Sequence, residues 1–234
     1  MEQIYTIPVN EAFDECVADP KKGCPFCMLY RKLQNDELDI ILGASMMEPD
    51  IRKSTNEYGF CHNHYSMMMR RKRMLGIGLM MESHLAEVEK KIDGPTLLGN
   101  KVQASLSAID VLNKDCYVCG RIGKNLSAMI ATAVYLFESD PSFKPKFKKV
   151  PYFCLPHYKA MVEYASKKMP KRSFRDLYDT AHSIEKEYIG SLKGDVSWFC
   201  KKFDYRYDEE PWYNSKDSVQ RSIKFLCGEL GLDD

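Results

Sequence analysis

The chain has 234 residues, of which 44% are hydrophobic and 29% charged, and its 34 basic and 33 acidic side chains leave a net charge of +1. This composition is that of an ordinary globular protein with a buried core, and the near balance of charges gives no argument for a polyanionic partner. The first residues lack the basic and apolar segments of a signal peptide, and no apolar run reaches the length of about 18 residues that suggests a membrane span. The sequence therefore predicts a cytoplasmic protein that does not contact a membrane.

Hydrophobic residues recur at helical spacing along most of the chain. A short first helix is expected near residues 10–16, ended by the Asp-Pro-Lys-Lys-Gly stretch at 19–23. The glycines at 190 and 194 predict a break in a long later helix, because glycine weakens helix interiors. No convincing alternating strand pattern is present, so we predict an all-α fold. The further helices are expected near residues 28–42, 62–92, 96–112, 125–137, 154–168, 172–203 and 215–228.

Four cysteine motifs show that part of the chain is duplicated. Phe-Cys-x-x-His-Tyr occurs at residues 60–65 and again at 153–158, and a CxxC precedes each copy, at 24–27 and 116–119. Equivalent cysteines of the two CxxC motifs are 92 residues apart, and equivalent residues of the two CxxH motifs are 93 apart. We therefore expect two pseudo-repeats and additional helices, packed as one body. The predicted parts are a first repeat at 1–94, a linker helix at 95–112, a second repeat at 113–170 and a C-terminal helical extension at 171–234.

The duplicated residues are those that bind zinc in structural sites. Zinc takes four ligands in a tetrahedron, and three cysteines with one histidine are a standard set. His64 is favoured over His62 as the first histidine ligand, because the position equivalent to His62 in the second copy is Leu155. Pairing each CxxC with the CxxH that follows it predicts two sites. They are Cys24, Cys27, Cys61 and His64 for the first, and Cys116, Cys119, Cys154 and His157 for the second.

Two zinc ions are the favoured cofactors, and an iron–sulfur cluster is the alternative. A thiol redox role is a further alternative, because Cys24-Pro25-Phe26-Cys27 is similar to a glutaredoxin motif. A redox motif of that kind follows a strand directly, whereas a chain-breaking segment precedes Cys24. Metal release through the CxxC pairs is a variant of the same hypothesis. Cys16, Cys200 and Cys227 are expected to be buried packing residues, and His84 and His182 to be ordinary, partly exposed histidines.

Nucleic-acid binding is an alternative function, because Arg70–Arg73 and Lys144–Lys149 are basic segments in a protein with zinc motifs. Solvated surface charge explains such segments equally well. Catalysis has little support, since the common hydrolase, phosphate-binding and metalloprotease motifs are missing and four protein ligands leave zinc no open position. Acidic residues that could serve an enzyme are Glu48, Asp50, Asp208, Glu209 and Glu210.

The chain also resembles a bacterial family of unknown function, found mostly in anaerobic Firmicutes. The resemblance rests on four segments, Tyr5–Asn10, Cys24–Cys27, Leu42–Arg52 leading to Gly59–Cys61, and Lys202–Arg206 followed by Pro211-Trp212. It spans nearly the whole chain and implies one architecture and a bacterial cytosolic protein, with no activity to transfer. Together the observations predict a non-enzymatic zinc protein whose two structural sites support a helical surface for an unknown protein partner.

Overall fold

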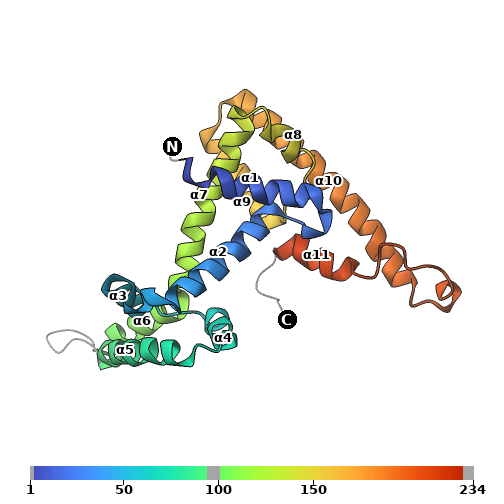
Figure 1. Ribbon diagram of the computed structural model, residues 1–234. Helices are drawn as coiled ribbons and strands as arrows, with labels where there is room; N and C mark the ends of the chain where they lie inside the picture. The colour runs from blue at the N-terminus through green and yellow to red at the C-terminus, as the bar shows by residue number, and fades with distance from the viewer. Residues whose placement is uncertain (1–2, 94–100, 229–234) are drawn as a thin grey trace. The chain divides into compact units, whose positions relative to one another are not determined.

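The computed structural model describes residues 3–93 and 101–228. Within these residues the fold consists of eleven α-helices and four short 3-10 helices without any strand, which confirms the all-α prediction (Figure 1). The α-helices are α1 (Thr6–Ala18), α2 (Pro25–Ile41), α3 (Pro49–Tyr58), α4 (His62–Arg70), α5 (Met74–Asp93), α6 (Lys101–Lys114), α7 (Tyr117–Ser139), α8 (Phe143–Phe147), α9 (Leu155–Lys168), α10 (Lys171–Lys201) and α11 (Ser218–Cys227). The 3-10 helices are η1 (Gln3–Tyr5), η2 (Pro20–Lys22), η3 (Ala44–Met47) and η4 (Tyr205–Tyr207).

The helices form two compact units. Unit 1 consists of Met1–Tyr30 and Leu126–Asp234, and unit 2 of Arg31–Asn125. Helices α2 and α7 each begin in one unit and end in the other. The units therefore do not coincide with the sequence repeats, because each unit contains part of the first repeat and part of the second.

The core of unit 1 is a cluster of phenylalanines. The Phe13 ring lies 4.7 Å from that of Phe143 and 5.7 Å from that of Phe26. Helix α8 packs on α1, while α9, α10 and α11 pack on one another (Figure 1). Burying a phenylalanine side chain contributes about 1.5–3 kcal/mol, so this cluster is a major source of the unit's stability. The fully buried members are Phe13, Phe26, Phe143, Phe147 and Phe153.

In unit 2, helix α5 packs on both α3 and α6, which also contact each other, and it contacts α4 as well (Figure 1). The helix expected at 62–92 is divided into α4 and α5, with a turn at Lys72, whose φ is +57°. The glycines at 76 and 78 lie inside α5. The linker helix expected at 96–112 is observed as Lys101–Lys114, and residues 96–100 lie outside the described residues.

The predicted break in the long C-terminal helix is wrong. Helix α10 runs without interruption from Lys171 to Lys201, and Gly190 and Gly194 lie within it. Each glycine costs about 1 kcal/mol relative to alanine. Packing of one apolar face of α10 on α9 and α11 offsets this cost.

Candidate metal centres

All four cysteine motifs lie at helix N-termini. Cys24 directly precedes α2 and Cys116 directly precedes α7. Cys61 and Cys154 are the N-cap residues of α4 and α9, respectively. The second ligand of each motif follows three residues later, so both side chains lie on the same face of the first turn. The helix dipole favours negative charge at this end, which stabilises thiolates.

The structure brings the motifs together in two clusters, one in each unit. Site A, in unit 1, consists of Cys24, Cys27, Cys154 and His157. Site B, in unit 2, consists of Cys61, His64, Cys116 and Cys119. In both clusters the four candidate ligand atoms lie within 4.8 Å of one another. Among the described residues, no other group gathers three or more metal-ligating side chains in this way.

The spacing of the atoms in site A suits a single tetrahedral ion. The Sγ atoms of Cys27 and Cys154 are 3.5 Å apart. His157 Nδ1 lies 3.7, 3.5 and 3.1 Å from the Sγ atoms of Cys24, Cys27 and Cys154. Zinc bonds of about 2.3 Å to sulfur and 2.0–2.1 Å to nitrogen place two sulfurs about 3.8 Å apart, and a sulfur and a nitrogen about 3.6 Å apart, in a tetrahedron. These four distances therefore match the zinc geometry to within about half an ångström.

Site B has the same geometry. The Sγ atoms of Cys61 and Cys119 are 3.9 Å apart. His64 Nδ1 lies 3.1, 3.3 and 3.5 Å from the Sγ atoms of Cys61, Cys116 and Cys119. In both clusters the histidine thus presents Nδ1 to the three sulfurs. The structure also places His64 at the site and not His62, as the sequence comparison predicts.

The predicted pairing of the motifs is wrong, although the same eight residues are brought together. Each CxxC joins the CxxH of the other repeat and not the one that follows it. Helix α2 has 17 residues and carries the chain about 25 Å away from Cys27. Helix α3 and the start of α4 stay in unit 2, so Cys61 does not return to the start of α2, which belongs to unit 1.

Site A is enclosed by the core of unit 1. Cys24, Cys27 and Cys154 are each at most 2% exposed. The ring of Phe26, between the two cysteines of the CxxC, lies 6.0 Å from that of His157. Gly228 closes the site from the end of α11, since a Cβ atom there would lie 3.4 Å from the Cys154 sulfur. Its φ of +77° is in the left-handed region, which glycine adopts without strain.

A buried carboxyl group supports the second motif of site A. Glu185 of α10 is 4% exposed and accepts a hydrogen bond of 2.7 Å from the backbone N–H of Phe153, the residue before Cys154. Its other carboxyl oxygen has no hydrogen-bond partner among the described residues. Burial raises the pKa of Glu185 to about 7. The side chain therefore fixes the backbone that leads into α9.

Site B lies at the protein surface. His64 is 1% exposed, but Cys61 is half-buried and Cys119 is exposed. The other ring nitrogen of His64, Nε2, lies 3.1 Å from the side-chain amide of Gln34, which is itself 2% exposed. With Nδ1 on a metal ion, Nε2 carries the proton and would donate it to the amide oxygen after rotation of the amide group. Gln34 thus fixes the orientation of the His64 ring through the nitrogen that does not face the sulfurs.

Within each site, neighbouring cysteine thiols have pKa values shifted in opposite directions. The pKa of Cys116 falls to about 3, because the Cys119 thiol donates a hydrogen bond to it and so stabilises the thiolate, and the pKa of Cys119 rises correspondingly. In site A, a hydrogen bond from Cys154 lowers the pKa of Cys27, while burial raises that of Cys24. Three thiolates this close repel one another unless a cation lies between them. A divalent ion would supply that charge and displace the protons.

The other candidate residues lie apart from the two sites. Cys16 is buried as expected, with its Sγ 3.1 Å from Met28 Sδ. The prediction that Cys200 and Cys227 are buried is wrong. Both are exposed and lie at the C-terminal ends of α10 and α11. His84 is only 8% exposed, so the prediction that it is partly exposed is wrong. Its Nδ1 lies 3.1 Å from the Asn56 carbonyl oxygen. His182 is exposed and stacks on the ring of Tyr178.

Two supporting residues were not expected from the sequence. Gln34 lies outside the cysteine motifs, and nothing in the sequence around it indicates a role at a metal site. Glu185, however, interrupts the apolar stripe of α10 between Ala181 and Leu192, and a charged residue in such a stripe is a signal of a buried polar role.

Comparison with known proteins identifies a family but no activity. Among the described residues, no helix has the length and apolar content needed to span a bilayer. No curated protein and no solved structure matches the chain. Residues 1–233 match the family described as a family of unknown function (DUF6062). The match covers nearly the whole sequence, and the chain therefore belongs to this family.

Proposed function

We propose that the protein binds two zinc ions in sites A and B, and that these ions have a structural and not a catalytic role. The observation that carries the proposal is the tetrahedral spacing of three sulfurs and one imidazole nitrogen in each cluster. Four protein ligands fill the coordination sphere of zinc and leave no position for a reacting water. A single ion suits atoms within 4.8 Å of one another better than an iron–sulfur cluster, which holds several metal atoms between its ligands.

Each ion would fasten together two helix starts that are far apart in the sequence. Site A joins α2 to α9, and its Cys27 and Cys154 are separated by 127 residues. Site B joins α4 to α7, and its His64 and Cys116 are separated by 52 residues. Closing such long loops by a cross-link removes conformational entropy from the unfolded chain. Binding of the ions therefore stabilises the folded state of each unit.

Helices α5 and α6, which lie in the chain between the two helices joined by site B, would present a surface to a protein partner. Helix α6 has no buried residue, and its Val102 and Leu106 are 68% and 53% exposed. On α5, which packs on α6, Leu85 and Ile92 are 62% and 49% exposed. Apolar side chains gathered on neighbouring helices are typical of surfaces that bind other proteins.

Because the family resemblance implies it, we include a bacterial cytosolic setting in the proposal.

The basic segments give the nucleic-acid alternative less support. Lys144 forms an ion pair with Asp176, and Lys146 forms one of 2.7 Å with Asp14. Arg71 is paired with Asp39 in the same manner. Cations paired with carboxylates of their own unit contribute less to phosphate binding than free ones.

Metal analysis of protein purified without chelator and without added zinc tests the proposal. We expect two equivalents of zinc per chain. Protein without metal, or with iron and visible absorbance, would contradict it. A salt-sensitive shift on binding to RNA would support the nucleic-acid alternative instead.

A further inference from the structure

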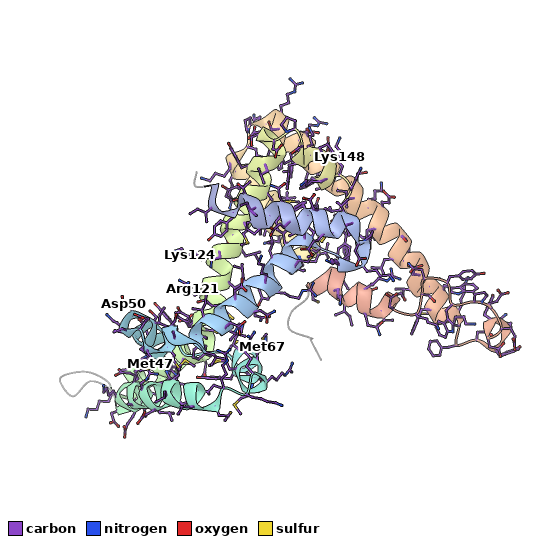
Figure 2. All side chains as sticks on the ribbon, viewed as in Figure 1. Met47, Asp50, Met67, Arg121, Lys124 and Lys148 are labelled. Carbon is purple, nitrogen blue, oxygen red and sulfur yellow. The ribbon has the colours of Figure 1, made fainter. Side chains whose placement is uncertain are left out.

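A cavity opens beside site B and reaches its most exposed ligand. Its volume is about 790 Å³, and Cys116 and Cys119 form part of its wall. Asp50 of α3, together with Arg121 and Lys124 of α7, lines the same cavity (Figure 2). A small molecule that enters the cavity therefore lies next to a candidate metal ligand.

Among the six cysteines of the two sites, Cys119 is the most exposed. In site A the three cysteines are each at most 2% exposed, and in site B Cys116 is 8% exposed. Metal-bound thiolates remain nucleophiles, and access then decides which of them reacts. Glycine follows Cys119 at position 120, and a Cβ atom there would meet no heavy atom within 4 Å, so the helix surface next to Cys119 is open.

We propose that Cys119 is a modification site, at which the metal-bound sulfur of site B is alkylated by small, soft electrophiles that enter the cavity. This inference rests on the proposed function, because the metal ion supplies the thiolate. The thiolate forms a bond to the electrophilic carbon, and the bond to the leaving group breaks with its electron pair on that group. No proton is transferred. The product is a neutral thioether, which is a weaker zinc ligand than a thiolate, so site B releases its ion.

The charge of the cavity wall favours a reaction in which an anion leaves. Lys114, Arg121 and Lys124 line it against only two carboxylates, those of Asp50 and Asp115. Arg121 is partly neutralised by Glu37 at 2.9 Å, and Lys114 is partly neutralised by Asp110 at 3.7 Å. Lys124 forms no ion pair among the described residues, so its charge is available to the cavity. The expected class of reagent is therefore a small alkyl donor with an anionic leaving group.

Alkylation with iodoacetamide tests the inference. Cys200 and Cys227 are exposed as well, so both are first replaced by serine. In this background we expect Cys119 to be labelled at least about tenfold faster than Cys24, Cys27 and Cys154, as measured by peptide mass spectrometry. One of two equivalents of zinc should appear in a chromogenic chelator as the label accumulates. Cys119→Ser in the same background is the matched control: it should hold one ion, in site A, and should release no zinc on treatment.

The following outcomes would overturn the inference. Even labelling of all the cysteines, faster labelling of site A, or labelling of Cys119 without zinc release would each contradict it. Suppression of the labelling by excess zinc would show that only the released thiol reacts. Metal content is measured first: protein without metal contradicts both the proposed function and this inference, whereas protein with two ions and an unreactive Cys119 contradicts this inference alone.

Discussion

Sites A and B have the same four ligand types, the same position at two helix N-termini and nearly the same interatomic distances, yet their surroundings differ. The sulfurs of site A are buried and Gly228 lies against them, whereas Cys119 of site B faces a cavity. The duplicated motif thus specifies how a metal is held. The helices around each motif decide what else can reach it.

This difference predicts unequal contributions to stability. At site A, loss of the ion would leave three thiols buried in an apolar core, where polar groups without partners are costly. At site B, solvent can hydrate the freed ligands, because Cys61 and Cys119 are accessible. We expect unit 1 to depend on its ion more strongly than unit 2.

The largest effect is expected from removing one ligand of each site. Cys154→Ala and Cys61→Ala should each lower the zinc content from two equivalents to one. Cys154→Ala should reduce the free energy of unfolding by more than about 4 kcal/mol, because it removes the ion and leaves a cavity in the core. Cys61→Ala should cost less. Denaturant unfolding followed by circular dichroism, together with metal analysis, measures both effects, and equal losses of stability would contradict the comparison.

The pH dependence of stability isolates unit 1. The pKa of Glu185 is about 7 in the folded protein, above the value of about 4.5 expected when unfolded, so its contribution to stability is complete below pH 4.5 and lost as the pH rises through 7. Glu185→Gln removes this loss and retains an oxygen that can accept the Phe153 N–H. Between pH 5 and pH 8 the free energy of unfolding of the variant should therefore gain up to about 3 kcal/mol relative to wild type.

This experiment has an internal control. Loss of metal at low pH affects both proteins alike and cancels in the difference between them. The matched control is Glu87→Gln, because Glu87 is half-exposed on α5 and pairs with Lys90. A difference that does not change with pH would show that Glu185 is ionised to the same extent in the folded and unfolded states.

A smaller effect, confined to site B, is expected from Gln34→Leu. The substitution removes the partner of His64 Nε2 without touching a ligand. Loss of such a partner typically weakens metal affinity about 10–100-fold. Competition with a chelator should therefore show one weakened site and one unchanged site. Weakening of both sites, or of neither, would contradict the assigned role.

The sequence identifies which residues are metal ligands, but it does not identify which two motifs share a site. Two CxxC and two CxxH motifs at matched offsets identify Cys24 and its counterparts because zinc requires a fixed donor set at short spacing. The same spacing is compatible with either pairing of the motifs. The choice depends on whether the chain after α2 returns Cys61 to the start of α2 or keeps it in unit 2, and a local pattern does not contain this information.

Tertiary packing also explains the other differences. Gly190 and Gly194 lower the helical propensity of α10, but its apolar stripe is packed along the helix and prevents a break. Cysteines such as Cys200 are often buried, but Cys200 lies on a face of α10 that stays exposed. The all-α class was predictable because it follows from periodicity summed over many residues.

The smallest effect concerns the charge of the cavity at site B. Lys124→Ala should slow the labelling of Cys119 by iodoacetate, an anion, about twofold, and leave labelling by neutral iodoacetamide nearly unchanged, because one surface cation contributes only a few tenths of a kcal/mol at moderate salt. Lys148→Ala is the matched control, since Lys148 is also an exposed lysine but lies in unit 1 (Figure 2). The difference between the two variants should vanish at about 1 M salt, where the screening length is about 3 Å. Equal rates for both variants at low salt would show that Cys119 owes its reactivity to access alone.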